Sequence, residues 1–138
     1  MKIKLSAIIL CLFVVLACDV NRTDAQDEEI QELIATESGG EEALNAMLEE
    51  IRSMAHSVSC ENPSRWRITP YGSKACGGPQ GYIAYSSEIN VKEFLELVEM
   101  HRRTEEAFNI KYGVISDCAL IGAPEDVTCI DGKPEFIY

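Results

Sequence analysis

Several common signatures of catalytic and metal-binding proteins are missing from this chain of 138 residues. It has only two histidines, and none of its six cysteines forms a Cys-x-x-Cys pair, so the usual spacing of zinc ligands is absent. The G-x-S-x-G and G-x-x-x-x-G-K-[ST] motifs are absent too. The sequence therefore gives no support for an α/β-hydrolase nucleophile or a phosphate-binding loop, and we expect no metal and no cofactor.

Basic residues are also scarce. The chain has 12 lysines and arginines against 23 acidic residues, and its formal net charge is −11. The acidity is concentrated near the front, where eleven acidic residues and a single arginine lie between Asp19 and Glu50. Binding to nucleic acid requires a basic surface that neutralises phosphates. We therefore exclude nucleic acid as a partner.

No apolar run is long enough to span a bilayer, which takes about 20 residues. The longest apolar run, residues 5–17, follows a short basic stretch and leads directly into Cys18, the last residue of Val15-Leu-Ala-Cys18. These are the features of an export signal covering 1–17, and the last four residues resemble a bacterial lipobox. We expect an exported protein held to a membrane of the cell envelope by acylation of Cys18, palmitate included. Ordinary signal-peptidase cleavage, which would give a secreted soluble protein, is the alternative.

The mature chain is large enough for one small domain. Residues 18–40 are acidic and polar, which is typical of a tether, and 41–138 form the expected single domain. Four cysteines remain there: Cys60, Cys76, Cys118 and Cys129. An even count in a short exported chain predicts two disulfides, for which three connectivities exist. Pairing sequence neighbours gives Cys60–Cys76 and Cys118–Cys129.

Hydrophobic periodicity predicts an α+β fold. Apolar residues at three- and four-residue spacing predict helices over 41–58 and 91–111. Ser38 is the expected cap of the first helix, and Asn90 with Glu93 forms a capping box for the second. Alternating patterns predict strands over 65–69, 81–85, 127–130 and 135–138, with Asp131-Gly132 as a hairpin turn. We expect a small antiparallel sheet packed against the long helix, with the N-terminal helix alongside and two disulfides.

Aromatic residues surround a loop, 70–80, that is rich in glycine and proline. If exposed, they form a platform for a carbohydrate or a protein ligand, with two polar side chains beside them. The alternative is that the aromatic rings fill the core of the sheet. The candidate ligand-binding residues are Trp66, Tyr71, Lys74, Gln80, Tyr82 and Tyr85.

Residues suited to catalysis are few. His101 and Glu105 lie one helical turn apart and could share a metal, but we expect an ordinary exposed pair. Cys76 near Lys74 could be an activated thiol with His101 as its base, although the even cysteine count favours a disulfide. No catalytic residue is assigned.

The run Tyr71-Gly-Ser-Lys-Ala-Cys-Gly-Gly-Pro-Gln-Gly-Tyr-Ile-Ala-Tyr85 resembles a family of small exported bacterial domains, many of them lipoproteins, without assigned activity. The similarity covers roughly residues 60–138, including the 91–112 helix and the closing strands. The resemblance implies export and paired cysteines, and it implies no catalytic role for any residue.

The favoured hypothesis is a lipid-anchored binding or envelope-interaction module that is monomeric and uses the 71–85 loop for recognition. Two alternatives belong to other classes. One is a protease inhibitor that presents the same loop, with Lys74 entering the protease. The other is a small secreted hydrolase that uses His101.

Overall fold

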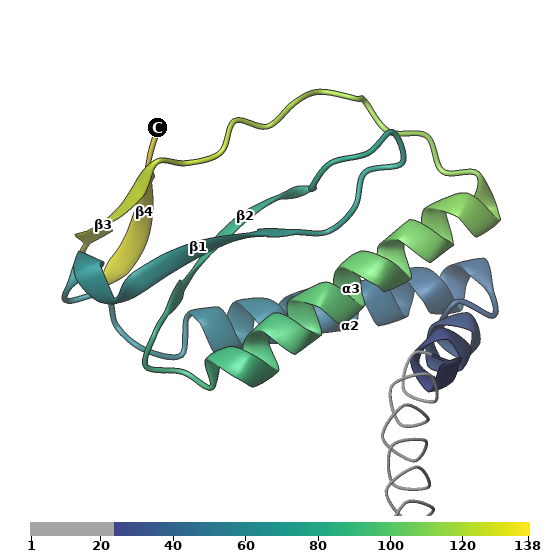
Figure 1. Ribbon diagram of the computed structural model, residues 1–138, viewed down its shortest axis with the longest axis horizontal. Coiled ribbons are helices and arrows are strands. Elements are labelled where there is room, and N and C mark those ends of the chain that lie inside the picture. Colours follow the sequence, from purple (N-terminus) through teal and green to yellow (C-terminus); the bar gives the residue numbers. More distant parts are fainter. Residues whose placement is uncertain (1–23) are drawn as a thin grey trace, which may run out of the picture. The chain divides into compact units, whose positions relative to one another are not determined.

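The computed structural model describes residues 24–138 (Figure 1). The expected signal peptide, 1–17, and the expected lipidation site, Cys18, lie outside the described residues. The chain divides into two compact units, Met1–Glu32 and Leu33–Tyr138. In the first unit residues 24–32 are helical. None of the helices formed by residues 24–138 combines the length and the apolar character needed to cross a membrane.

The second unit has an α+β fold, as predicted. Its β-strands form two separate two-stranded antiparallel sheets, β1 with β2 and β3 with β4, instead of the single sheet expected. The elements are α2 (Glu37–Ala55), the short 3-10 helix η1 (Pro63–Arg65), β1 (Trp66–Tyr71), β2 (Gly81–Ser86), α3 (Val91–Tyr112), β3 (Asp126–Ile130) and β4 (Lys133–Ile137).

Helix α2 begins earlier than its apolar stripe indicates. Thr36, not Ser38, is the N-cap, and its side-chain oxygen accepts a hydrogen bond from the Gly39 N–H at 3.1 Å. Gly40 packs so closely on the Phe108 ring that an added Cβ would lie 2.6 Å from it. Residues 37–40, expected at the end of the tether, are therefore helical and packed.

The chain just before α2 is also fixed to the second unit. Ile34 is fully buried. Its carbonyl oxygen accepts hydrogen bonds from Lys111 Nζ at 2.8 Å and from the Tyr112 hydroxyl at 2.9 Å. The compact unit accordingly starts at Leu33, whereas the sequence pattern placed the start of the domain at 41.

Helix α3 follows its sequence signals closely. The Asn90 side-chain oxygen accepts from the Glu93 N–H at 3.4 Å, as an N-cap does. The Glu93 carboxylate accepts from the Asn90 side-chain amide at 2.7 Å, instead of from the Asn90 backbone N–H as in a capping box. Gly113 ends the helix with a φ of 63°, the left-handed conformation that glycine adopts without strain. Phe94 and Val98 lie on its buried face. The predicted caps of α3 are confirmed.

The β1–β2 hairpin is covered on both faces. One face contributes Ile83 and Tyr85 to a core shared with helices α2 and α3, where the Tyr85 and Phe94 rings lie 4.8 Å apart. The opposite face contributes Trp66 and Ala84 to a second cluster with Val127 of β3. Alternate residues of one strand thus supply two separate cores. In Figure 1 the hairpin runs along α3 and reaches the β3–β4 pair at the end where β1 begins.

The four cysteines form two disulfides, but the pairing of sequence neighbours is wrong. The bonds are Cys60–Cys129 and Cys76–Cys118, with Cα atoms 5.3 Å and 5.6 Å apart. The β3–β4 hairpin packs beside the start of β1, which brings Cys129 to Cys60. The chain that leaves α3 passes the 71–80 loop, which brings Cys118 to Cys76. Both bonds therefore join elements that are distant in sequence.

Candidate functional site

The six predicted ligand-binding residues do not form one platform. Trp66, Lys74 and Tyr85 are only 5%, 8% and 9% exposed. Trp66 and Tyr85 lie in different hydrophobic clusters, on opposite faces of the β1–β2 hairpin. Tyr71 and Tyr82 are half-buried, and Gln80 alone is exposed. The alternative interpretation, in which these aromatic rings fill the interior, therefore holds for Trp66 and Tyr85.

Lys74 has a bracing role. Its Nζ donates hydrogen bonds to Asp117 Oδ1 at 3.0 Å and to the Ala119 carbonyl at 2.8 Å. The bond from Lys74 lowers the pKa of the Asp117 carboxyl. These contacts lie beside the Cys76–Cys118 disulfide and hold the 71–80 loop to the chain that follows α3. The inhibitor hypothesis for this loop requires an exposed Lys74 that can enter a protease. The ammonium is buried, so it is not in a position to do so.

Glu105 holds the other side of the same loop. Its Oε2 accepts from the Ser73 N–H at 2.5 Å, and its Oε1 accepts from Gln80 Nε2 at 3.2 Å. Asn109, one turn further along α3, donates to the Ser73 carbonyl at 2.8 Å. Both carboxylate oxygens of Glu105 are thus used to fix the loop, and Gln80 is part of that arrangement.

His101 is buried on α3 and is not part of the expected exposed pair. It is 3% exposed, and its Nδ1 has no hydrogen-bond partner among residues 24–138. Burial lowers the pKa of the imidazole, against the opposing effects of the Glu105 charge and a hydrogen bond with the Leu44 backbone. Cys76 is disulfide-bonded and so is not a free thiol. Among residues 24–138 no three histidine, cysteine or acidic side chains are grouped in a way that could hold a metal.

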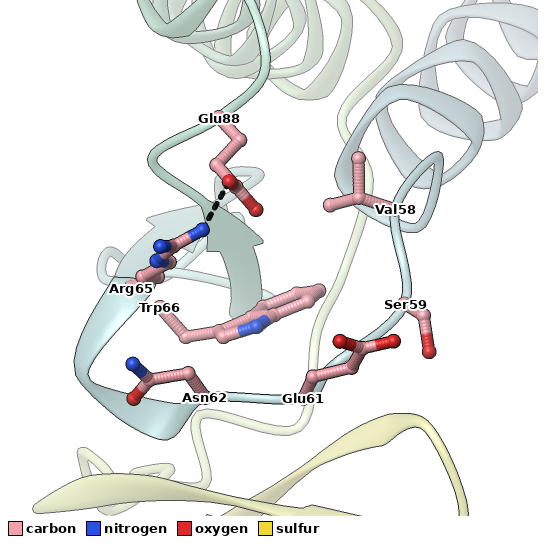
Figure 2. Close-up of a pocket in the computed structure, with 7 residues that line it drawn as sticks. All are labelled: Val58, Ser59, Glu61, Asn62, Arg65, Trp66 and Glu88. Carbon is pink, nitrogen blue, oxygen red and sulfur yellow. Dashed lines mark hydrogen bonds and ion pairs between the residues drawn. The ribbon is translucent and has the colours of Figure 1, made fainter.

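A polar hollow forms around the other end of the hairpin, at Trp66. It has a volume of about 510 Å³, which lies in the range typical of small-molecule sites. Figure 2 shows the indole ring in the middle of the labelled side chains, with Arg65 and Glu88 on one side and Glu61 and Ser59 on the other. The residues that line this tryptophan hollow are Val58, Ser59, Glu61, Asn62, Arg65, Trp66 and Glu88.

Covalent and backbone bonds hold the wall of the tryptophan hollow in place. Cys60 is disulfide-bonded to Cys129, and its N–H donates to the Gly132 carbonyl at 2.8 Å. Asn62 caps η1, because its side-chain oxygen accepts from the N–H and the hydroxyl of Ser64 at 3.0 Å and 2.8 Å. The 58–62 segment is therefore tied to the β3–β4 hairpin at one point and to η1 at the next.

The charges around the tryptophan hollow are unbalanced. Arg65 Nη1 and Glu88 Oε1 form an ion pair at 2.5 Å. Within the described part of the chain, no ion pair is formed by Glu61 that would neutralise it. Two carboxylates and one guanidinium leave the lining with a net charge of −1. Such a lining disfavours an anionic ligand and suits a neutral or cationic one.

A second hollow adjoins the first. It has a volume of about 640 Å³ and shares Val58 and Ser59 with the tryptophan hollow. Its other wall is residues 131–135, which are the turn of the β3–β4 hairpin and the start of β4. The two hollows together give this end of the domain a longer concave surface than one pocket alone provides.

Sequence reasoning found Trp66 but missed the polar residues beside it. Glu61 and Asn62 follow directly after Cys60 and precede Pro63, so a turn at a disulfide was readable from the sequence. Glu88 could not be found in this way, because it reaches Arg65 only through the antiparallel pairing of Trp66 with Ser86.

The fold and the site define a class of protein: a small disulfide-braced α+β domain with a polar hollow around its single tryptophan. No family model matches this chain, and no curated protein and no solved structure matches it either.

Proposed function

We propose that this protein is an exported recognition module, anchored to a membrane of the cell envelope through an acyl group on Cys18, that binds a carbohydrate in the tryptophan hollow. The observation that carries the proposal is the placement of the only tryptophan among two carboxylates, an amide and a guanidinium. The proposal concerns binding, with no chemical change in the ligand.

The mix of groups is suited to a polyhydroxylated ligand. The indole is only 5% exposed and is no stacking platform, so the hydroxyls of a sugar, which both donate and accept hydrogen bonds, would be bound by the polar side chains around it. Glu61 supplies acceptor oxygens, whereas the amide of Asn62 and the guanidinium of Arg65 supply donors. Because the lining carries a net negative charge, a neutral sugar or an amino sugar is favoured over a sugar acid or a phosphate.

The proposed location agrees with the covalent structure. Disulfides persist in oxidising compartments outside the cytosol, and this domain has two of them in a core of modest size. The acidic stretch between Asp19 and Glu50 would be repelled by an anionic membrane surface, which favours a domain held away from the lipid.

Trp66 is the sole tryptophan, so the intrinsic fluorescence of the protein reports directly on the tryptophan hollow. The purified protein is titrated with tri-N-acetylglucosamine, with maltotriose, and with trilysine and triglutamate as charged peptides. We expect a saturable change in Trp66 emission with at least one oligosaccharide. Glu61→Gln should weaken that binding about tenfold, because a hydrogen bond to a charged group contributes about 1.5–3 kcal/mol.

The matched control is Glu50→Gln, which removes an exposed carboxylate of α2 that does not line the hollow. It should leave the affinity unchanged. If trilysine alone changes the emission, the site recognises a cationic peptide and the carbohydrate proposal is wrong. A response that is the same in Glu61→Gln and in the unmodified protein would also contradict it.

The other two hypotheses lose the residues on which they depended. A hydrolase using His101 needs an accessible imidazole, and this one is buried between helices. An inhibitor presenting Lys74 needs an exposed ammonium, and this one is buried against Asp117 and Ala119.

A further inference from the structure

The two disulfides differ in how far solvent reaches them. Cys60 is 3% exposed and packs in the apolar cluster around Trp66, and Cys129 is half-buried. Cys76 and Cys118 are both exposed. Thiol–disulfide exchange begins when a thiolate reaches one sulfur atom of the bond, so access helps to set its rate. A thiol from outside can therefore approach the Cys76–Cys118 bond in the folded domain, whereas Cys60–Cys129 is shielded.

The backbone at the exposed bond is strained. Among the described residues other than glycine, only Cys118 and Asp131 have a positive φ, and Asp131 lies in the β3–β4 turn. Cys118, with a φ of 30°, belongs to no such turn, and a residue with a side chain keeps this conformation only where its surroundings impose it. The cross-link to Cys76 is one of those constraints. Cleavage of the bond therefore allows the backbone at Cys118 to relax, and strained, exposed disulfides are the ones most readily reduced.

A hydroxyl lies against one sulfur atom of this bond. Ser116 Oγ is 3.1 Å from Cys76 Sγ, and the same oxygen accepts a hydrogen bond from the Cys76 N–H at 3.3 Å. A disulfide sulfur carries no proton, so the hydroxyl of Ser116 is the group that donates toward it. When the bond is cleaved, the same hydroxyl can donate to a thiolate on Cys76. A stabilised thiolate is the better leaving group in exchange.

A buried positive charge lies beside the other half of the bond. Lys74 Nζ donates to Asp117 Oδ1 and to the Ala119 carbonyl, the residues on either side of Cys118. The ammonium offsets the Asp117 carboxylate, which would otherwise repel an approaching thiolate. Cations close to a cysteine favour its ionised form. The surroundings thus suit both the arrival of a thiolate and the departure of one.

We propose that Cys76–Cys118 is a reversible redox site that exchanges with a dithiol oxidoreductase, and that Cys60–Cys129 is a lasting structural bond. A thiolate of the partner forms a bond with Cys118 Sγ, and Cys76 leaves as a thiolate beside Ser116. The second thiol of the partner then attacks the partner's own sulfur in this mixed disulfide and releases Cys118. Two electrons pass to this protein, its two sulfurs take up the two protons that the dithiol loses, and the partner becomes a disulfide.

Reduction would loosen one end of the domain. The Cys76–Cys118 bond joins the 71–80 loop to the connection between α3 and β3, which meet at the end of the hairpin away from β4 (Figure 1). The apolar core shared by α2, β2 and α3 contains neither cysteine, and the pairing of β3 with β4 does not involve them. The site is therefore separate from the tryptophan hollow, which lies beside the other disulfide.

The test follows the two bonds separately in the folded, full-length protein. Dithiothreitol or reduced thioredoxin is added, free thiols are blocked with N-ethylmaleimide at intervals, and peptide mapping locates them. We expect Cys76 and Cys118 to be labelled about tenfold faster, or more, than Cys60 and Cys129. The emission of Trp66 should stay constant during the first phase, because this ring packs with the second pair. Oxidised glutathione should then restore the first bond.

Two further measurements test the route. Thioredoxin that lacks its resolving cysteine should be trapped on Cys118, with Cys76 free to react with N-ethylmaleimide. Ser116→Ala should slow the reduction of this bond about fivefold, as expected for the loss of one hydrogen bond. The matched control is Ser53→Ala, which removes an exposed hydroxyl of α2 and should leave the rate unchanged.

Equal rates for the two disulfides, or faster reduction of Cys60–Cys129, would overturn the proposal. Reduction of Cys76–Cys118 only after urea has unfolded the domain would overturn it as well, because the site would then not be open in the native protein. Capture of thioredoxin on Cys76, or an unchanged rate in Ser116→Ala, would contradict the assigned leaving group. None of these outcomes depends on the binding of a sugar in the tryptophan hollow.

Discussion

The two disulfides fix the two ends of the β1–β2 hairpin in contrasting ways. At the tryptophan end, Cys60 is 3% exposed and packs with Trp66 and Val127 in an apolar cluster. At the lysine end, defined by Lys74 and the Cys76–Cys118 bond, both cysteines are exposed. There the loop is held by polar contacts, chiefly those of Lys74 and Glu105.

The contrast shows two routes to rigidity in one small domain. Where enough apolar surface is available, the disulfide adds to a core that already excludes water. Where the chain is rich in glycine and exposed, no core is available, and a cross-link together with charged hydrogen bonds holds the backbone instead. The tryptophan hollow lies beside the Cys60–Cys129 disulfide, so it is positioned by groups that do not themselves line it.

The largest expected effect comes from removing each disulfide separately by a double cysteine-to-alanine change. The bonds close loops of similar size, with sequence separations of 69 and 42, and each loop alone is worth about 4 kcal/mol of unfolding free energy. Loss of Cys60–Cys129 should cost about 1–2 kcal/mol more than loss of Cys76–Cys118, because it also leaves a void in a buried cluster. Urea denaturation of the two variants measures the difference.

The comparison between the ends fails if the two variants are equally destabilised, or if the Cys76–Cys118 variant is the less stable. Hydrogen exchange sharpens the result. Loss of Cys76–Cys118 should raise exchange in the 71–80 loop and in residues 114–125 while β3 and β4 stay protected, since their backbone pairing does not depend on that bond.

The sequence predicted the elements better than their arrangement. Helix α3 was readable because its caps are local signals within a few residues, Asn90 with Glu93 and then Gly113. The start of α2 was misplaced, because burial of Gly40 depends on Phe108, 68 positions further along the chain. The disulfide pairing was wrong for the same reason: each bond depends on packing between distant segments.

The residues of the candidate site also fall into those that the sequence could predict and those that it could not. The tryptophan was recognised because its type is rare in this chain, but its neighbours Glu61 and Glu88 come from separate segments. Lys74 was singled out as a contact for a ligand, and its type is usually exposed. Only the folded arrangement places a partner carboxylate and a carbonyl within reach of its ammonium.

A glycine pair sharpens the comparison at the lysine end with a smaller effect. Gly72 and Gly77 both have positive φ, 72° and 94°, so alanine is strained at either position. An added Cβ at Gly72 would lie 2.7 Å from Glu105 Oε2 and from Gln80 Cγ, whereas at Gly77 it would meet nothing within 4 Å. We expect Gly72→Ala to cost about 2–3 kcal/mol and Gly77→Ala about 1 kcal/mol. Thermal unfolding compares them; equal losses would mean that Glu105 does not brace the loop tightly.

The smallest expected effect on stability concerns buried polar groups on α3. Unlike the polar groups at the lysine end, they lack hydrogen-bond partners within the described residues. His101 Nδ1 and Thr104 Oγ1 are buried on α3, and neither has a hydrogen-bond partner in the part of the chain that the structure describes. Burial lowers the pKa of His101 below the ordinary value of 6.5, although the Glu105 charge acts in the opposite direction and the Arg52 charge reinforces the effect of burial. As the pH falls through about 6.5, the unfolded chain therefore binds a proton that the folded chain does not, and stability decreases.

The measurement is urea denaturation between pH 7.5 and pH 5, with His101→Gln compared to the unmodified protein. The variant should lose less stability over this range, because carboxylates act alike in both proteins and cancel in the difference. Thr104→Val removes the neighbouring buried hydroxyl without removing a titrating group, so it should keep the slope of the unmodified protein. Identical slopes for His101→Gln and the unmodified protein would show that the buried imidazole accepts its proton as readily when folded as when unfolded. In that case the buried imidazole would not make stability depend on pH, and the lack of a hydrogen-bond partner would not set this part of α3 apart from the hydrogen-bonded lysine end.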